Sequence, residues 1–493
     1  TATSRATAGV GVIPDMITFT ADGTRLLAAI EAEPTQGYTV DAPGGIAVID
    51  VASWTSTFHG FSAFDAQVNA LRASGVKIAN GFGEGNTALP SMDLEPEYIT
   101  VVGNTAYVTI QEANAIGVFN LTPGAEGWTA VLPLGLSNHN LAGNGIDTSD
   151  RDGGAIIRQV PISGLYQPDS IASFVQGGIT YLVTANEGDG REYGGAFNEE
   201  VRISALVPAT GSTPPAGMPA LDAALLAQIQ PRLGSADLGR LQVSRWSGDT
   251  DGDGDLDQLH AIGSRSFSIW EVGGTDVAPT ITQVFNSGQM IDQIIASQAP
   301  ALYDDARSDN KGTEPEQITL GTVDGQLYAF VGLERANTTI AFRIDSPTNV
   351  QFAGLLSNPG DVAPEGSVFI PANGGTPARL VVSNEVSTTT TAFNVTAPSA
   401  ANYTLQILHG SDFEAGLLAT QRADRFAAIV DRLEDALPNS ITLSGGDNFI
   451  PGPFGAAGTD VTMVPVLRAY WEQALGLTPG ALTSLHGTNL ATA

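Results

Sequence analysis

The chain has 493 residues, of which 42% are apolar, and its 52 acidic residues against 21 basic ones give a net charge of −31. This excess of negative charge argues against nucleic acid and anionic membrane as partners. The absence of cysteine excludes disulfides and thiolate metal sites. No apolar run approaches the ~18 residues that a membrane span needs, so we expect no membrane insertion.

One sequence unit recurs along the chain from its N-terminal end. Each copy has a proline and an acidic residue, an alternating strand, a turn, a second strand, and a final Glu or Asn-Glu. The copies occupy residues 14–34, 96–115, 168–192, 315–335 and 364–385. Repeats of this kind indicate stacked copies of one sheet, as in the blades of a propeller. We expect an all-β fold, a six- or seven-bladed β-propeller over residues 1–397 with seven blades preferred. A degenerate sixth repeat is expected in residues 238–272, and a seventh in residues 134–163.

The acidic residues of the repeat are predicted to gather at one rim of this propeller. The start of the first strand and the end of the second strand of a blade meet at the same face, beside the central channel. The residues concerned are Asp15, Glu31, Glu97, Glu112, Asp169, Glu187, Glu316, Glu334, Glu365 and Glu385. So many carboxylates cannot lie together ionised without cations. The candidate metal ligands are Glu31, Glu97, Glu187, Glu316, Glu334, Glu365 and Glu385. The alternative is structural, with each Glu bonding backbone amides of neighbouring blades.

A hard-cation centre of this kind suits Ca²⁺, Mg²⁺ or Mn²⁺, and a two-metal centre could also hold Zn²⁺. It could activate water against a phosphorus centre. Arg191 and Arg335 adjoin the carboxylates, where they either bind a phosphoryl oxygen or neutralise the Glu residues. The candidate catalytic residues are therefore Glu187, Glu385, Arg191 and Arg335.

An insertion at about residues 205–239, helical around residues 220–230, precedes a candidate calcium loop at residues 249–260. Alternate aspartates with Gly at the sixth position are typical of such a loop. The residues are Asp249, Asp251, Asp253, Asp255 and Asp257, with Asp255 offering its backbone carbonyl. The twelfth position is His260, where an EF-hand has a bidentate Glu. A solvated acidic turn is the alternative. Asp147, Asp150 and Asp152 form a weaker second candidate.

The pattern changes after residue 397. Residues 403–409 and 441–449 read as strands, and residues 417–436 and 460–475 as helices, which predicts the beginning of a parallel α/β sheet over residues 398–493. Asp412 and Asp447 each follow a strand end, where α/β active sites form. Together they would suit a two-metal phosphoesterase.

The segments PDMITFTADGTRLL, VTANEGDGREY, GDTDGDGDLD, RSDNKGTEPE, GLERANTTIAF and VVSNE resemble the choice-of-anchor I family of exported bacterial β-propellers. The resemblance runs from about residue 9 to 397. Its members are often labelled alkaline-phosphatase-like, and a propeller phosphotriesterase is similar in its Asn-Glu strand ends. This implies a secreted, periplasmic or cell-surface protein whose leader has been removed, with Glu187 and Glu385 as metal ligands.

Residues 403–454 resemble the opening of the calcineurin-like domain of 5′-nucleotidases. Asp412 and Asp447 match that pattern, but Glu414 stands where the family has His, and the family's Gly-Asn-His-Glu motif is absent.

Three functions follow from these patterns. The first is a secreted metal-dependent phosphoric-ester hydrolase of the alkaline phosphatase or phosphotriesterase type, acting on a small phosphoester as a monomer. The second is a non-catalytic, calcium-binding extracellular propeller. The third is a truncated 5′-nucleotidase.

Overall fold

A computed structural model describes residues 9–78, 88–208, 214–397, 406–410 and 440–444. The chain divides into two compact units, Thr1–Ala397 and Pro398–Ala493. The larger unit is built mostly of β-strands arranged in several four-stranded sheets, which confirms the expected β class.

Five sheets follow one another along the larger unit, and each is an antiparallel meander. The first holds β1 (Pro14–Phe19), β2 (Arg25–Ile30), β3 (Gly45–Asp50) and β4 (Ser56–Gly60). The second holds β5 (Ile99–Val102), β6 (Thr105–Ile110), β7 (Ala115–Asn120) and β8 (Gly127–Pro133). The third holds β11 (Ile171–Gln176), β12 (Ile179–Asn186), β18 (Ser266–Thr275) and β19 (Ala278–Asn286). The fourth holds β20 (Pro315–Val323), β21 (Gln326–Leu333), β22 (Thr338–Ser346) and β23 (Asn349–Leu356). The fifth has three strands, β24 (Pro364–Ile370), β25 (Ala378–Asn384) and β26 (Thr389–Val395).

The first strands of successive sheets contact one another, β1 with β5, β5 with β11, β11 with β20, and β20 with β24. They are therefore the inner strands of the arrangement. Each sheet packs its apolar side chains on the next sheet, because alternate residues of a strand point to opposite faces. The first and second sheets share one buried cluster, the second and third another, and the fourth and fifth a third.

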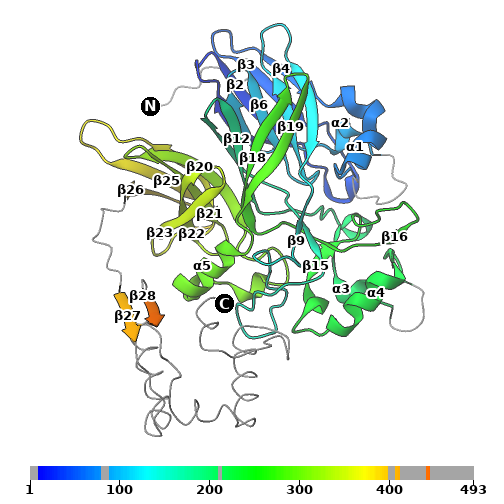
Figure 1. Ribbon diagram of the computed structural model, residues 1–493. Coiled ribbons are helices and arrows are strands. Elements are labelled where there is room, and N and C mark those ends of the chain that lie inside the picture. The colour runs from blue at the N-terminus through cyan, green and yellow to red at the C-terminus, as the bar shows by residue number, and fades with distance from the viewer. Residues whose placement is uncertain (1–8, 79–87, 209–213, 398–405, 411–439, 445–493) are drawn as a thin grey trace. The chain divides into compact units, whose positions relative to one another are not determined.

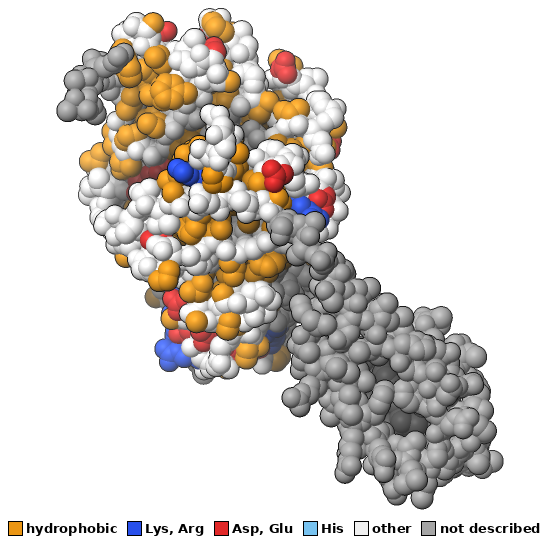
Figure 2. Space-filling view, turned by 90° about the vertical axis from the view of Figure 1, so that its left-hand side faces the viewer, with side chains coloured by type: hydrophobic (Ala, Val, Ile, Leu, Met, Phe, Trp, Pro, Cys, Tyr) orange, Lys and Arg blue, Asp and Glu red, His pale blue; other side chains and the backbone are white. Residues whose placement is uncertain are grey.

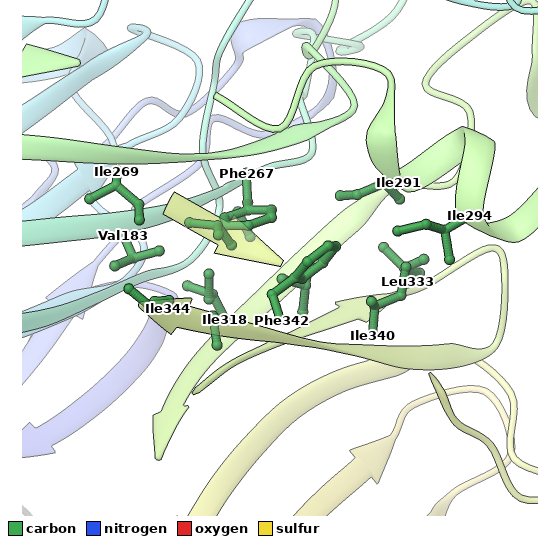
Figure 3. Packing of buried hydrophobic residues seen from close by; sticks show 14 of the residues in the cluster. Val183, Phe267, Ile269, Ile291, Ile294, Ile318, Leu333, Ile340, Phe342 and Ile344 are labelled. Atoms are coloured by element: carbon green, nitrogen blue, oxygen red, sulfur yellow. The ribbon is translucent and has the colours of Figure 1, made fainter. Parts of the chain in front are cut away.

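A large cluster joins the third and fourth sheets and helix α5 (Met290–Gln298) (Figure 3). Phe267 of β18 lies near Phe342 of β22 in the middle of the cluster, Ile269 lies at one end, and Ile291 of α5 covers the other end. The rings of Phe267 and Phe342 lie 4.7 Å apart at an interplanar angle of 41°, a tilted arrangement that aromatic pairs favour. This layer fixes the position of the inner strand β20 beside β11.

The segments expected to form a sixth and a seventh blade fold differently. A separate five-stranded sheet joins β13, β15, β17, β10 and β9 in that order. Their bounds are Glu200–Arg202, Gln242–Ser244, His260–Ala261, Ser163–Leu165 and Leu136–Asn138. Ser266–Thr275, the last part of the expected sixth repeat, is the third strand of the third sheet and pairs with β12 across the insertion (Figure 1). The described residues thus show five sheets of the repeated kind, because these short strands pair with one another instead of forming meanders.

The insertion packs with its flanking segments in one separate apolar cluster, in which Leu225 of the insertion joins Ile162 and Val243. Helix α4 (Ala223–Ile229) lies where a helix was expected, and Asp222 caps it by accepting from the amides of Ala224 and Leu225. The smaller pair β14 (Ala220–Leu221) and β16 (Asp255–Leu256) is parallel. The remaining α-helices are α1 (Val68–Ser74), α2 (Pro90–Asp93) and α3 (Ile203–Leu206). The 3₁₀ turns are Gln36–Tyr38, Ser62–Gln67, Gly195–Phe197, Gln230–Arg232, Leu238–Arg240, Pro300–Leu302 and Asp305–Arg307.

The first strands of the first and fifth sheets carry exposed apolar side chains. Ile17 and Phe19 of β1 are 62% and 56% exposed, and Val368 and Ile370 of β24 are 55% and 47% exposed. On the face of the molecule shown in Figure 2, apolar side chains lie among neutral polar ones, and charged side chains are few. Among the described residues, no buried cluster joins these two sheets.

The smaller unit has two described strands, β27 (Gln406–Gly410) and β28 (Ser440–Ser444), which pair in parallel. The expected helices, Asp412 and Asp447 lie outside the described residues.

Candidate metal centre at the carboxylate rim

The proline-acid positions lie at one end of the inner strands. Asp15, Glu316 and Glu365 are the second residues of β1, β20 and β24. In all three strands the pairing register shifts at this point, between Pro14 and Ile17, Pro315 and Ile318, and Pro364 and Gly366. A bulge of this kind re-aims a side chain out of the regular ladder. It therefore lets the acidic residue leave the sheet face at the rim.

The glutamates at the second-strand ends lie at the same rim because the second strand runs antiparallel to the first. The amide of Glu31 donates to the carbonyl of Ile13 at 3.1 Å, and that of Glu334 donates to Glu314 at 3.0 Å. The amide of Glu385 donates to Ala363 at 2.8 Å. Each bond joins a glutamate to the residue that immediately precedes the proline-acid pair of the same sheet. The local sequence thus brings both acids of a repeat together.

The backbone at this rim is strained. Four residues that precede the prolines have a positive φ: Ile13 at 50°, Gln167 at 41°, Glu314 at 51° and Ala363 at 59°. Non-glycine residues rarely adopt this conformation; each instance costs about 1–3 kcal/mol and persists only where the surrounding structure enforces it. Strain repeated at one rim is typical of a functional site.

The ten acids of the repeat are here called the carboxylate rim, and neighbouring members of it raise each other's pKa. The members are Asp15, Glu31, Glu97, Glu112, Asp169, Glu187, Glu316, Glu334, Glu365 and Glu385. Burial, together with the nearby charges of Glu112 and Asp169, raises the pKa of Glu97 well above its usual range. Partial desolvation of its carboxylate raises the pKa of Glu365, although the residue as a whole is exposed, and Glu385, Glu187 and Asp15 raise it further. Inner-strand acids from the first and fifth sheets therefore sense each other's charge.

The most compact part of the rim is the group Glu187, Glu316 and Glu334, whose nearest carboxylate oxygens all lie within 4.8 Å of one another. Glu187 and Glu334 are buried, and Glu316 is half-buried. One oxygen of Glu316 is buried without a hydrogen-bond partner. Unpaired buried carboxylate oxygens are costly, and a divalent cation is the usual partner of such a group.

Two basic residues adjoin this group. The ammonium of Lys311 lies 2.7 Å from Glu187 and 3.4 Å from Asp189, and Gln111 donates to the other oxygen of Glu187 at 2.8 Å. Arg335 is 2.9 Å from Glu334 and 2.9 Å from Glu314. These two cations are outnumbered by the three carboxylates of the group together with Asp189 and Glu314, which they also bind. The group retains an excess of negative charge that a cation would balance.

The pKa values of the rim reflect this excess. Burial first, and neighbouring carboxylates second, raise the pKa of Glu31 to about 9. Burial and a hydrogen bond to Glu314 raise the pKa of Glu334 to about 8. Burial raises the pKa of Glu112 to about 7, although Arg191 opposes the shift. In the absence of a cation, these groups hold protons near neutral pH.

Arg191 lies in a buried ion group and not at an open surface. Its side chain is 1% exposed, and its guanidinium is 2.9 Å from Glu95 and 3.6 Å from Asp93. Nearby carboxylates keep its pKa well above the usual range. Arg191 was predicted either to bind a phosphoryl oxygen or to neutralise carboxylates. Its buried position beside Glu95 and Asp93 suits the neutralisation of carboxylates. Glu365 and Glu385 are exposed at the rim, outside the compact group.

The Asp249 loop is a tight turn in which the aspartates accept hydrogen bonds from backbone amides of the loop. Asp249 accepts from the amides of Gly252 and Gly254, and Asp257 accepts from Thr250 at 2.7 Å. Oxygens of Asp249, Asp251 and Asp257 lie within 4.8 Å of one another. Asp253 and Asp255 are not in this compact group; the amide of Asp255 donates to Asp253 at 3.1 Å.

The weaker aspartate candidate is rearranged. Asp147 and Asp152 group with Asp305, whereas Asp150 pairs with Arg240 at 2.7 Å. The sequence analysis did not predict Asp305 or Lys311 as members of these sites. Both residues belong to the segment before the fourth repeat, where no sequence pattern links them to the acidic residues that they approach.

The model of the choice-of-anchor I domain matches residues 2–347. The chain belongs to the choice-of-anchor I family. It is 30% identical to Gigasin-3a of Magallana gigas over 122 residues. This aligned segment covers 22% of this chain and 40% of Gigasin-3a. It is 25% identical over 325 residues to a mesenchyme-specific cell surface glycoprotein of Strongylocentrotus purpuratus, covering 58% of this chain and 40% of that protein. The chain thus spans less than half the length of these relatives.

Solved structures resemble this choice-of-anchor I chain only distantly. A periplasmic gluconolactonase of Pseudomonas aeruginosa is 12% identical with a TM-score of 0.26, over 78% of this chain and 86% of that one. A protein from Desulfotomaculum acetoxidans is 10% identical with a TM-score of 0.30, and the match covers 78% of this chain and 83% of that one. Among the helices of the described residues, none has the length and apolarity that crossing a bilayer requires.

Proposed function

We propose that this choice-of-anchor I protein is an extracellular or cell-surface protein that binds divalent cations at its carboxylate rim. The observation that carries the proposal is the group Glu187, Glu316 and Glu334, with three ligand oxygens within 4.8 Å and one buried oxygen of Glu316 unpaired. Carboxylate oxygens are the ligands of Ca²⁺, Mg²⁺ and Mn²⁺, so the centre favours a hard cation. A seven-bladed closure of the ring and a second cation in the Asp249 loop belong to the same proposal.

The test is metal analysis of purified protein after equilibration with Ca²⁺ or Mn²⁺ and gel filtration. We expect the wild type to retain at least one cation that Glu334→Gln loses. Asp324→Asn is the matched control, because it removes a carboxylate from an exposed turn with a positive φ of 49°, which Asn accepts readily. Equal metal content in all three proteins would contradict the proposal.

A second candidate function is hydrolysis of a small phosphoric ester at the same centre. Arg335 favours it, because its half-exposed guanidinium lies 2.9 Å from Glu334 and suits a phosphoryl oxygen. In this reading a bound cation supplies Lewis acidity, and Glu187 and Arg335 position the substrate. We expect turnover of a phosphate mono-, di- or triester that falls in Arg335→Gln while cation content is kept. No turnover with Ca²⁺, Mn²⁺, Mg²⁺ or Zn²⁺ would leave the cation-binding function alone.

A further inference from the structure

An acidic group outside both the carboxylate rim and the Asp249 loop is formed by Asp147, Asp152 and Asp305. The nearest carboxylate oxygens of these three residues all lie within 4.8 Å of one another. Asp147 and Asp152 belong to the loop that precedes β10, whereas Asp305 begins the 3₁₀ turn that precedes β20. Tertiary packing therefore brings the carboxylates together, because no local turn could join segments so far apart in the sequence.

The carboxylates of this group are held in place, yet one of their oxygens lacks a partner. Asp147 is fully buried and accepts from the amide of Ile156 at 3.0 Å and from the hydroxyl of Tyr303 at 3.1 Å. The side chain of Asp152 is 5% exposed, and Arg158 bonds one of its oxygens. The other oxygen of Asp152 is buried without a hydrogen-bond partner. Such an oxygen is costly to bury, and a hard cation is a natural partner for it.

The basic side chains around the group leave two of its carboxylates without an ion pair. Among the described residues, Arg158 is the one basic side chain that bonds an oxygen of these three carboxylates. Arg265 is close, but its guanidinium donates to backbone carbonyls, one of them that of Asp147 at 2.6 Å. Arg265 also faces the buried carboxylate of Asp292, where it opposes the rise in pKa that burial causes. Asp292 thus offsets the charge of Arg265, and Asp147 and Asp305 keep theirs.

Asp305 connects the group with solvent. It is half-buried, whereas Asp147 is fully buried, so a cation can enter from the side of Asp305. Desolvation raises the pKa of Asp305, and the nearby charge of Asp147 raises it further. The two carboxylates therefore repel each other unless a cation lies between them.

We propose that Asp147, Asp152 and Asp305 bind one hard divalent cation of the Ca²⁺ class, which joins the loop of residues 147–152 to the turn of residues 305–307. Carboxylate oxygens are the ligands that such cations take, and water fills the remaining positions. Because the ligands come from two distant segments, the cation cross-links them and stabilises the folded state selectively. This site shares no residue with the rim centre and does not depend on it.

The first test counts bound calcium. The full chain and its variants are dialysed to equilibrium against Ca²⁺, and bound calcium is measured by elemental analysis. Asp305→Asn should bind one Ca²⁺ fewer per chain than the wild type. Asp152→Asn, which keeps an oxygen for Arg158, should show the same loss. Asp304→Asn is the matched control, because Asp304 is an exposed neighbour that caps the same turn through the amide of Ala306, a role that Asn also fills.

The second test separates a lost ligand from a damaged fold. Ca²⁺ should raise the melting temperature of Asp305→Asn less than that of the wild type or of Asp304→Asn. Asp305→Asn should also remove one Ca²⁺ from the Glu334→Gln protein, so an empty rim centre leaves the comparison intact. Equal calcium content and an equal calcium-induced rise in melting temperature in folded Asp305→Asn and wild-type proteins would overturn the proposal.

Discussion

Single residues at the rim make the stability of the cation-free protein dependent on pH. In the folded state the pKa values of Glu112, Glu334 and Glu31 are about 7, 8 and 9, whereas in the unfolded chain a glutamate has its ordinary pKa of about 4.5. The folded state therefore binds more protons, and the free energy of unfolding falls as pH rises from about 4.5 to about 9. Melting temperatures in chelator across this range should decrease. A melting temperature that rises steadily through this window would contradict the assigned carboxylates.

Replacing one rim carboxylate should have opposite effects with and without cation. Glu334→Gln removes a ligand, so we expect the dissociation constant for Ca²⁺ or Mn²⁺ to rise about tenfold or more. In chelator above pH about 8, where Glu334 is ionised, the same change removes repulsion from a crowded group, and the variant should unfold at a temperature equal to or above that of the wild type. Titration calorimetry and thermal unfolding measure the two effects. Asp324→Asn should change neither.

The residues of the rim were largely predictable, and their partners were not. The repeat places Asp15, Glu187 and Glu316 at strand ends, and strand direction then brings them to one rim. Lys311 and Glu314 come from a loop whose sequence has no periodicity, so their pairing with Glu187 and Arg335 depends on how the fourth sheet docks. The burial of Arg191 also arises from tertiary packing.

At the scale of elements, the layer between the third and fourth sheets should dominate stability. Phe342 is fully buried in it, and Phe342→Ala should lower the free energy of unfolding by about 3–5 kcal/mol. Phe352 lies opposite it on β23 and is 41% exposed, so Phe352→Ala should cost clearly less. Denaturant unfolding of both variants is the measurement. Equal losses would show that this layer is not the main contact between the sheets.

The Asp249 loop should bind a cation independently of the rim. Trp246 lines the same cleft as Asp249, so it should sensitise the luminescence of Tb³⁺ bound in the loop. We expect Asp251→Asn to lower this signal strongly and Glu334→Gln to leave it unchanged. A signal insensitive to Asp251→Asn would show that the loop is only a hydrogen-bonded acidic turn.

Elements that keep the repeat were predictable from their alternation, and those in the insertion were not. Ser266–Thr275 joins the third sheet although a long insertion separates it from β12. Strands as short as His260–Ala261 have too few residues to show a period, so the sequence could not assign them to the five-stranded sheet.

At the scale of the whole molecule, the five sheets carry the acids of the repeat to one rim, where burial and neighbouring carboxylates raise their pKa values. This arrangement makes sense chemically if a cation resides at the rim, because the alternative is a set of protonated or repelling carboxylates. The large net charge adds a general repulsion that salt screens, so monovalent salt should stabilise the protein modestly even without a divalent cation.

The most direct test of the rim centre is anomalous diffraction from crystals grown with Mn²⁺. We expect a peak within about 2.0–2.6 Å of carboxylate oxygens of Glu187, Glu316 and Glu334, and we expect this peak to be lost in Glu334→Gln crystals. A well-ordered rim with no anomalous peak at millimolar Mn²⁺, and with Lys311 still bound to Glu187, would contradict it.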